Sequence, residues 1–166
     1  SRFGVKIQYL EEKKQTGTAG SLVLLPQEVI EPILVSNGDL ICDLDFFSFF
    51  EMLFSFDFVL TGIQREQRSE FGELFVSESS ELLSWEEKPT RTQIINGGIY
   101  GISPNALSCL RSQISSGEYL DMPQLYTIMQ KHDLKTGVFV HQGEWKDVGR
   151  MEDYLELSKR MDENSI

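Results

Sequence analysis

The sequence predicts an α/β fold in which a mainly parallel sheet is flanked by helices. Short apolar runs bounded by turn residues alternate along the chain with segments in which apolar residues recur at helical spacing. Polar clusters follow several of the predicted strands, and open α/β sheets gather ligand-binding groups at the carboxyl ends of their strands. The 166 residues, of which 40% are hydrophobic, are enough for a single domain with one core.

The first third of the chain contains two predicted strands and a short helix. Residues 5–9 alternate apolar and polar side chains, which predicts a strand with one buried face. Residues 17–25 start with glycine and continue into leucines, so they predict a loop that opens a short helix before Pro26. Residues 33–35 form an apolar run that ends in the turn residues 36–39, as expected of a buried parallel strand.

A phenylalanine-rich segment follows, with seven phenylalanines between residues 46 and 58. Five apolar residues in it share helical spacing and predict a helix packed on the core. They are Phe46, Phe49, Phe50, Leu53 and Phe54. Phe47 would then point elsewhere, which leaves a subunit contact or an aggregation-prone patch as the minority interpretation.

The rest of the chain continues the alternation. Helices are expected to start at Ser103-Pro104 and at Asp121, because Ser and Asp cap helix N-termini and Pro fits the first turn. The further strands are expected over residues 58–60, 71–76, 82–85, 94–102 and 138–140, and a closing helix over residues 151–161.

The charge balance narrows the class of partner. The chain has 15 Lys and Arg against 26 Asp and Glu, a net charge of −11, which is the wrong sign for a nucleic-acid-binding protein. A small anionic ligand remains compatible, because backbone amides, a few cations and a divalent metal can hold phosphate locally. No apolar run reaches the roughly 20 residues of a membrane span, and no signal-peptide pattern opens the chain. The cytoplasm is therefore the expected location.

The two cysteines give no sign of a metal or disulfide framework. Cys42 and Cys109 lie far apart and lack CxxC or Cys/His spacing. We therefore expect reduced thiols in the core.

Four polar clusters stand at predicted strand or loop ends: Gly17-Thr18-Ala19, Asn37-Gly38-Asp39, Glu87-Lys88-Pro89 with Asn96-Gly97-Gly98, and Trp145-Lys146-Asp147-Val148-Gly149. Each alone is typical of an ordinary turn or cap. Their order resembles the sugar 1-phosphate nucleotidyltransferase (nucleotide-sugar pyrophosphorylase) family, which joins a nucleoside triphosphate to a sugar 1-phosphate. The resemblance runs from Gly4 to about Leu157 and implies a Rossmann-like nucleotidyltransferase domain over residues 1–166.

The resemblance implies a nucleotide site and a metal site. Gly17 and Thr18 would lie under the nucleobase, where a residue without a side chain lets a ring approach the backbone, and Gly38 would also contact the nucleotide. Asp39 and Asp147 match the two carboxylates that hold Mg²⁺ in the family, with coordination positions left for phosphate oxygens.

The resemblance also implies sugar-binding residues. Glu87 would bind sugar hydroxyls, Lys88 would bind the sugar phosphate, and Asn96 and Gly98 would lie near the sugar. With Lys88, Asp39 and Asp147 as the catalytic groups, the reaction would depend on positioning and charge neutralisation and would need no protein nucleophile.

Glu12 favours guanine as the base, and hence GTP as the nucleotide. In relatives the position five residues before Gly17 reads the base edge, and the two carboxylate oxygens of Glu12 suit the adjacent N1–H and N2–H donors of guanine. An amide there would better suit uracil or thymine. The alternative is a solvated loop acid among residues 11–14.

The family's Gly-rich phosphate loop, with its Arg and a following PKP segment, has no counterpart before Gly4. We therefore expect an N-terminally truncated domain that is inactive alone. The missing strands would open the sheet beside residues 5–9, so we expect displacement of that strand, pairing with another chain as in a homodimer, or a retained N-terminal piece. Residues 117–123 resemble the subgroup that carries cystathionine-synthase-type regulatory domains.

Two readings from other classes remain open. A non-catalytic nucleotide-sugar binding or sensor module would bind nucleotide sugar without turnover. An unrelated Rossmann-like interaction domain would leave Asp39 and Asp147 far apart.

Overall fold

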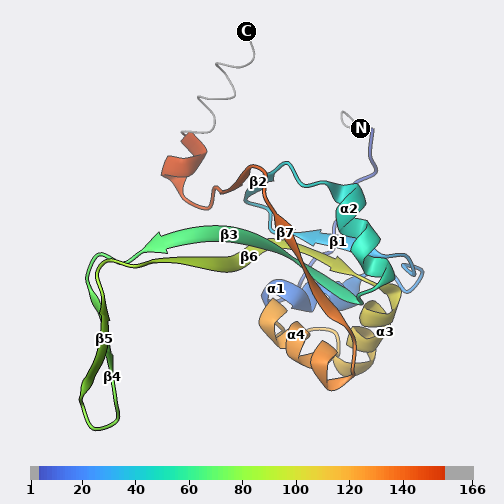
Figure 1. Ribbon diagram of the computed structural model, residues 1–166. Coiled ribbons are helices and arrows are strands. Elements are labelled where there is room, and N and C mark those ends of the chain that lie inside the picture. The colour runs from blue at the N-terminus through green and yellow to red at the C-terminus, as the bar shows by residue number, and fades with distance from the viewer. Residues whose placement is uncertain (1–3, 156–166) are drawn as a thin grey trace. The chain divides into compact units, whose positions relative to one another are not determined.

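The computed structural model describes residues 4–155, which divide into two compact units (Figure 1). Unit 1 comprises residues 4–38, Asp45–Leu60 and Ile99–Phe139, and unit 2 comprises Asp39–Leu44, Thr61–Gly98 and residues 140–155.

The sheet of unit 1 is built around the end of β6 (Thr90–Ile102). β1 (Ile33–Ser36) pairs with it antiparallel, from Ile33 opposite Ile102 to Ser36 opposite Ile99. The four-stranded sheet has the order β1-β6-β3-β7, where β3 is Phe58–Arg68 and β7 is Thr136–His141. The antiparallel pairing of β6 with β1 shows that the sheet is mixed.

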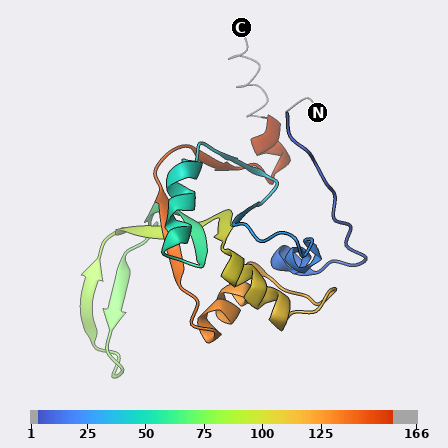
Figure 2. The same cartoon turned by 90° about the vertical axis from the view of Figure 1, so that its right-hand side faces the viewer.

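Helices α1 (Gly17–Gly20), α3 (Pro104–Gln113) and α4 (Met122–Lys131) cover one face of this sheet (Figures 1 and 2). The short 3-10 helix Ser21–Leu24 continues α1. Tyr100 and Ile102 point from β6 into the core that these helices share. As predicted, α3 begins after Ser103, whose hydroxyl oxygen accepts a hydrogen bond from the Ala106 amide at 3.1 Å.

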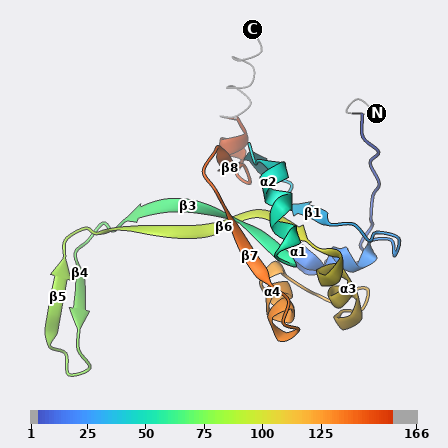
Figure 3. The ribbon, with the colours of Figure 1, turned by 45° about the vertical axis from the view of Figure 1, so that its right-hand side comes forward.

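Helix α2 (Phe46–Glu51) covers the other face (Figure 3). Alternation along β6 places Gly101 on that face, and a Cβ at Gly101 would come within 3.0 Å of the Phe49 ring. Phe49 is fully buried and packs edge-on against Phe139 at a centroid distance of 5.7 Å. The predicted apolar face is only partly correct, because the 3-10 turn Met52–Phe54 changes the helical period and leaves Phe54 92% exposed.

Unit 2 contains two antiparallel ribbons. β2 (Leu40–Cys42) pairs with β8 (Trp145–Asp147), with Leu40 opposite Asp147 and Cys42 opposite Trp145. β4 (Glu73–Val76) and β5 (Leu82–Glu86) run side by side as a hairpin (Figure 3).

Most of the predicted elements are observed, with two corrections: the strand at residues 33–35 is antiparallel to β6 and half-buried, where a buried parallel strand was expected, and the strand at residues 5–9 is absent. Residues 5–9 form no strand, and Val5, Ile7 and Tyr9 are exposed. Their alternation favours a strand only where a neighbouring strand offers hydrogen bonds, which local sequence cannot specify. The closing helix is seen over residues 151–155, and its predicted continuation lies outside the described residues. None of the helices within residues 4–155 has the length and apolar character to cross a membrane.

Candidate functional site

The β2–β8 ribbon of unit 2 brings Asp39 and Asp147 together. Asp39 immediately precedes β2, and Asp147 ends β8 opposite Leu40. The Val148 amide donates a hydrogen bond to the Asp39 carbonyl at 2.8 Å, which extends the ladder beyond the last residue pair. Residues more than a hundred positions apart are thus held as neighbours by a short antiparallel ladder.

Gly149 shows that the two carboxylates point to the same place. A Cβ at Gly149 would lie 3.1 Å from Asp147 Oδ1 and 3.2 Å from Asp39 Oδ2, so the two oxygens are separated by no more than the sum of these distances. The Gly149 amide donates to Asp147 Oδ1 at 2.9 Å and fixes that carboxylate. Two exposed carboxylates that converge in this way fit a hard divalent cation such as Mg²⁺, which accepts a few carboxylate oxygens and retains water.

The segment that contains Asn96 and Gly98 is tied to the same ribbon. Asn96 Oδ1 accepts a hydrogen bond from the Gly98 amide at 3.0 Å, and Gly98 has a φ of +74°, which favours glycine. The Trp145 indole N–H donates to the Gly97 carbonyl at 2.8 Å. Trp145 therefore links β8, which carries Asp147, to the part of β6 that carries Asn96.

Glu87 and Lys88 lie at the turn between β5 and β6. Both are exposed, and Lys88 has a φ of +46°, unusual for a residue with a side chain. Glu87 Oε2 accepts a hydrogen bond from the Trp85 indole at 3.2 Å. These two residues share unit 2 with the carboxylates, and the Glu87 carboxylate contacts Trp85 of β5.

The remaining predicted residues belong to unit 1. A cavity of about 430 Å³ lies beside the loop before α1. It is lined by Glu11, Glu12, Lys13, Lys14, Thr16, Gly20, Leu24, Ser116 and Gly117. The buried Thr16 hydroxyl donates a hydrogen bond to Glu12 Oε1, and the Glu12 side chain is exposed.

Gly17 is constrained by a loop that follows α3. Its φ is +83°, and a Cβ there would lie 2.5 Å from the Leu120 carbonyl oxygen. That carbonyl accepts from the Ala19 amide at 2.9 Å, and the Leu120 amide donates to the Thr16 carbonyl at 2.8 Å. Packing against residue 120 therefore requires glycine even without a bound base.

Asp121 holds residue 18, at the start of α1, through hydrogen bonds. Its Oδ1 accepts from the Thr18 amide at 2.9 Å and from the Thr18 hydroxyl at 3.2 Å, and its Oδ2 accepts from the Tyr119 hydroxyl at 2.8 Å. The hydrogen bond from the Thr18 amide is the main reason that the Asp121 pKa is lowered. The Thr18 hydroxyl is thus occupied within the protein, where it also accepts from the Met122 amide at 3.0 Å.

Gly38 is less constrained. A Cβ at this position would meet no atom within 4 Å, and Gly38 is absent from the positive-φ glycines of the described chain. Nothing in the local packing requires glycine there.

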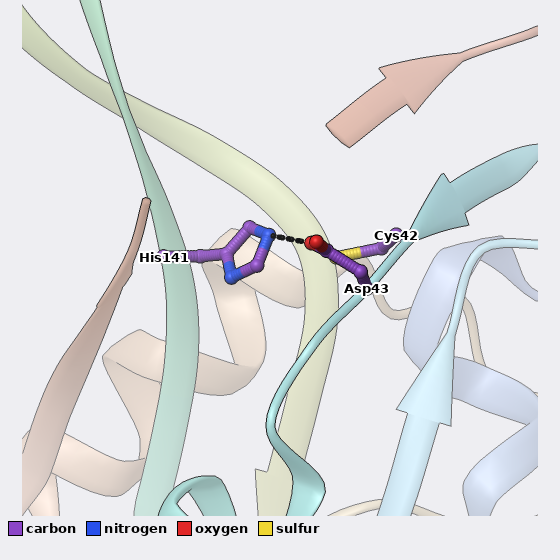
Figure 4. A group of neighbouring side chains, drawn as sticks. All are labelled: Cys42, Asp43 and His141. Carbon is purple, nitrogen blue, oxygen red and sulfur yellow. Dashed lines mark ion pairs between the residues drawn. The ribbon is translucent and has the colours of Figure 1, made fainter. Parts of the chain in front are cut away.

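A second cluster in unit 2 was missed by the sequence reasoning. Cys42, Asp43 and His141 come together where β2 and β7 end (Figure 4). Burial is the largest cause that raises the pKa of the Cys42 thiol, and both cysteines are free thiols as expected. Local spacing gave no signal, because the histidine comes from a strand far along the chain.

Comparison with known proteins identifies a family. The family model described as "Nucleotidyl transferase" matches residues 1–164. Mannose-1-phosphate guanyltransferase beta-A of Xenopus laevis is 30% identical over 162 residues, which cover 93% of this chain and 44% of that protein. The mannose-1-phosphate guanyltransferase of Schizosaccharomyces pombe is also 30% identical over 162 residues, with 92% and 43% covered. The chain thus spans less than half the length of these curated relatives.

A solved structure shares the fold. HddC from Yersinia pseudotuberculosis complexed with GMP-PN matches with a TM-score of 0.62 and 23% identity, over 90% of this chain and 64% of that one. The predicted α/β fold class is confirmed by this likeness.

Proposed function

The chain belongs to the nucleotidyl transferase family, and from this premise we propose that it serves in the transfer of a nucleotidyl group from GTP to a sugar 1-phosphate, with release of pyrophosphate. The observation that supports this most strongly is the convergence of the Asp39 and Asp147 carboxylates over Gly149. The relatives named as mannose-1-phosphate guanyltransferases support both the reaction class and the nucleotide.

In this reaction a phosphate oxygen of the sugar 1-phosphate attacks the α-phosphorus of the triphosphate. A new P–O bond forms there while the bond to the bridging oxygen breaks, and pyrophosphate leaves with that electron pair. Asp39 and Asp147 would hold Mg²⁺, which when bound offsets the negative charge of the phosphates. No side chain is required to form a covalent intermediate.

The other site residues would bind and orient the two substrates. The Lys88 ammonium would reduce the repulsion between the two anionic substrates. Glu87 would accept hydrogen bonds from sugar hydroxyls, and Asn96 and Gly98 would contact the sugar from the segment that Trp145 holds in place.

We assign the guanine preference to Glu12. The Thr16 hydroxyl occupies only one lone pair of Oε1, so both carboxylate oxygens can still accept from the N1–H and N2–H of guanine. The cavity beside Glu12 offers the space for a ligand group, and Lys13 and Lys14 also line it.

Calorimetric titration of the chain with GTP, UTP, dTTP, CTP and ATP in Mg²⁺ tests the nucleotide assignment. We expect GTP to bind most tightly, and Glu12→Gln to reduce the preference for GTP over UTP by about tenfold, since a carboxylate acceptor is replaced by a donor. Glu11→Gln, which alters the neighbouring acid of the same cavity, is the matched control. Tightest binding of UTP by the unmodified chain would contradict the assignment.

A coupled assay of pyrophosphate release with mannose 1-phosphate tests the reaction, made on the complete enzyme in which the Gly-rich phosphate loop precedes this chain. Release that requires Mg²⁺ and is nearly abolished by Asp39→Asn supports the transferase. Binding of GDP-mannose by the complete enzyme with no release of pyrophosphate would instead favour the non-catalytic nucleotide-sugar binding module.

A further inference from the structure

We propose that Cys42, Asp43 and His141 form a binding site for a borderline-soft divalent cation of the zinc type, distinct from the carboxylate pair at Asp39 and Asp147. Each of the three residues offers one ligand atom, and these sulfur, oxygen and nitrogen atoms all lie within 4.8 Å of one another. Thiolate and imidazole are ligands that select Zn²⁺ over Mg²⁺. The two clusters of unit 2 therefore differ in the cation that they suit.

The backbone holds the three residues in register. Cys42 ends β2 opposite Trp145, and the Asp43 amide donates to the Glu144 carbonyl at 3.2 Å, so residues 42 and 43 are fixed against β8. His141 ends β7 and reaches the same place from the other side of the short turn before β8. Figure 4 shows the imidazole ring facing the Asp43 carboxylate, with the Cys42 sulfur beside it.

The distances suit a tetrahedral ion. His141 Nε2 lies 3.0 Å from Asp43 Oδ1. Zinc bonds to nitrogen, oxygen and sulfur of about 2.0–2.3 Å place neighbouring ligand atoms about 3.3–3.8 Å apart. Small movements of the side chains would bring all three atoms onto one ion, with release of the thiol proton and of any proton on Nε2, which also lies 3.2 Å from the Glu144 carbonyl oxygen.

Burial and a nearby glycine indicate a shaped site with an entrance. The His141 side chain is only 6% exposed, whereas that of Asp43 is 63% exposed, so the imidazole is fixed inside while solvent reaches the carboxylate. A Cβ at Gly143 would lie 2.2 Å from Asp43 Oδ1, so only glycine lets the carboxylate occupy its place beside the imidazole. Water entering on the exposed side can supply a fourth ligand.

The site would act at a distance from the carboxylate pair. Asp39 precedes β2 and Cys42 ends it, so the two clusters lie at opposite ends of the same strand. A cation held by Cys42, Asp43 and His141 would join residues 140–141, the end of β7 that lies in unit 2, to the β2–β8 ribbon. It would thereby stabilise the ribbon that positions Asp39 and Asp147.

Cobalt substitution tests the site directly. We expect the reduced chain to bind one equivalent of Co²⁺ with the near-ultraviolet charge-transfer absorption of a cobalt–thiolate bond, and Zn²⁺ to displace it. Cys42→Ser should abolish that absorption, and His141→Gln and Gly143→Ala should weaken Zn²⁺ binding at least about tenfold. Cys109→Ser removes the other thiol and should leave the signal unchanged.

The cobalt–thiolate absorption of the unmodified chain tests the proposal even if a variant fails to fold. Absence of cobalt–thiolate absorption from the unmodified chain, or the same absorption in folded Cys42→Ser, would overturn the proposal. Because this readout involves neither nucleotide nor turnover, it stands or falls independently of the proposed transferase activity.

Discussion

The loop before α1 in unit 1 and the β2–β8 ribbon in unit 2 both hold residues together that are distant in sequence, but through different contacts. The loop is held by long-range hydrogen bonds, in which residues 120 and 121 are the partners of Thr16, Thr18 and Ala19. The ribbon has three residue pairs and leaves both carboxylates exposed. The loop before α1 is thus preorganised by contacts within the protein, whereas the two carboxylates of the ribbon are neighbours with like charge, for which we propose a shared cation.

Gly17→Ala should have the largest effect, because it breaks the preorganised side. The new Cβ would meet the Leu120 carbonyl and require a positive φ, so we expect a loss of about 2–4 kcal/mol in the free energy of unfolding. Chemical denaturation measures it. Gly38→Ala is the control, and a similar loss there would contradict the difference in packing.

Gly149→Ala should act on the ribbon with little effect on stability. Its Cβ would sit within 3.2 Å of both carboxylates and push them apart, so we expect Mn²⁺ affinity to fall about tenfold while circular dichroism is unchanged. Unchanged Mn²⁺ affinity would show that the carboxylates do not converge over this residue.

Trp145→Phe should weaken the link between β8 and β6. It removes the donor to the Gly97 carbonyl, which corresponds to about 1 kcal/mol of unfolding free energy. Trp85→Phe removes the hydrogen bond from the Trp85 indole N–H to Glu87 on the exposed hairpin. It should change the free energy of unfolding by less than about 0.5 kcal/mol. Equal losses in thermal unfolding would remove the special role of Trp145.

The smallest effect should be a pH dependence at Asp121. Because its pKa is lower in the folded chain than in the unfolded one, its stabilisation is complete at neutral pH and is lost as the pH falls through the usual Asp range and below the folded-state pKa. The Tm difference between the unmodified chain and Asp121→Asn should therefore shrink from pH 7 towards pH 3. A difference that grows in acid would contradict the assignment.

Helices whose starts are set by a few adjacent residues could be predicted from the sequence. Ser103-Pro104 and Asp121 marked the starts of α3 and α4 because capping is a property of a few adjacent residues. The β2–β8 ribbon was not predicted, since strands of three residues are too short to show a period. Phe54 was wrongly assigned to the apolar face of a helix. The spacing of apolar residues does not reveal the change from α to 3-10 geometry at Met52–Phe54.

The part of the candidate site that the order of the motifs predicts is the pair Asp39 and Asp147. The motif order predicts Asp39 and Asp147 as neighbours, and the β2–β8 ribbon holds them next to each other. Cys42 and His141 escaped notice because their proximity depends on the register of the β2–β8 ribbon and the end of β7. The role of Leu120 and Asp121 in holding residues 16–19 likewise arises only from tertiary contacts.

Mn²⁺ titration followed by electron paramagnetic resonance tests the central claim most directly, with Mn²⁺ as a probe for the proposed Mg²⁺. If Asp39 and Asp147 share one cation, Asp39→Asn and Asp147→Asn should each weaken binding at least about tenfold, and the double variant should lose much less than the sum of the two effects. Asp133→Asn, on an exposed turn of unit 1, should bind as the unmodified chain does. Strictly additive losses, or unmodified affinity in either single variant, would contradict a shared site.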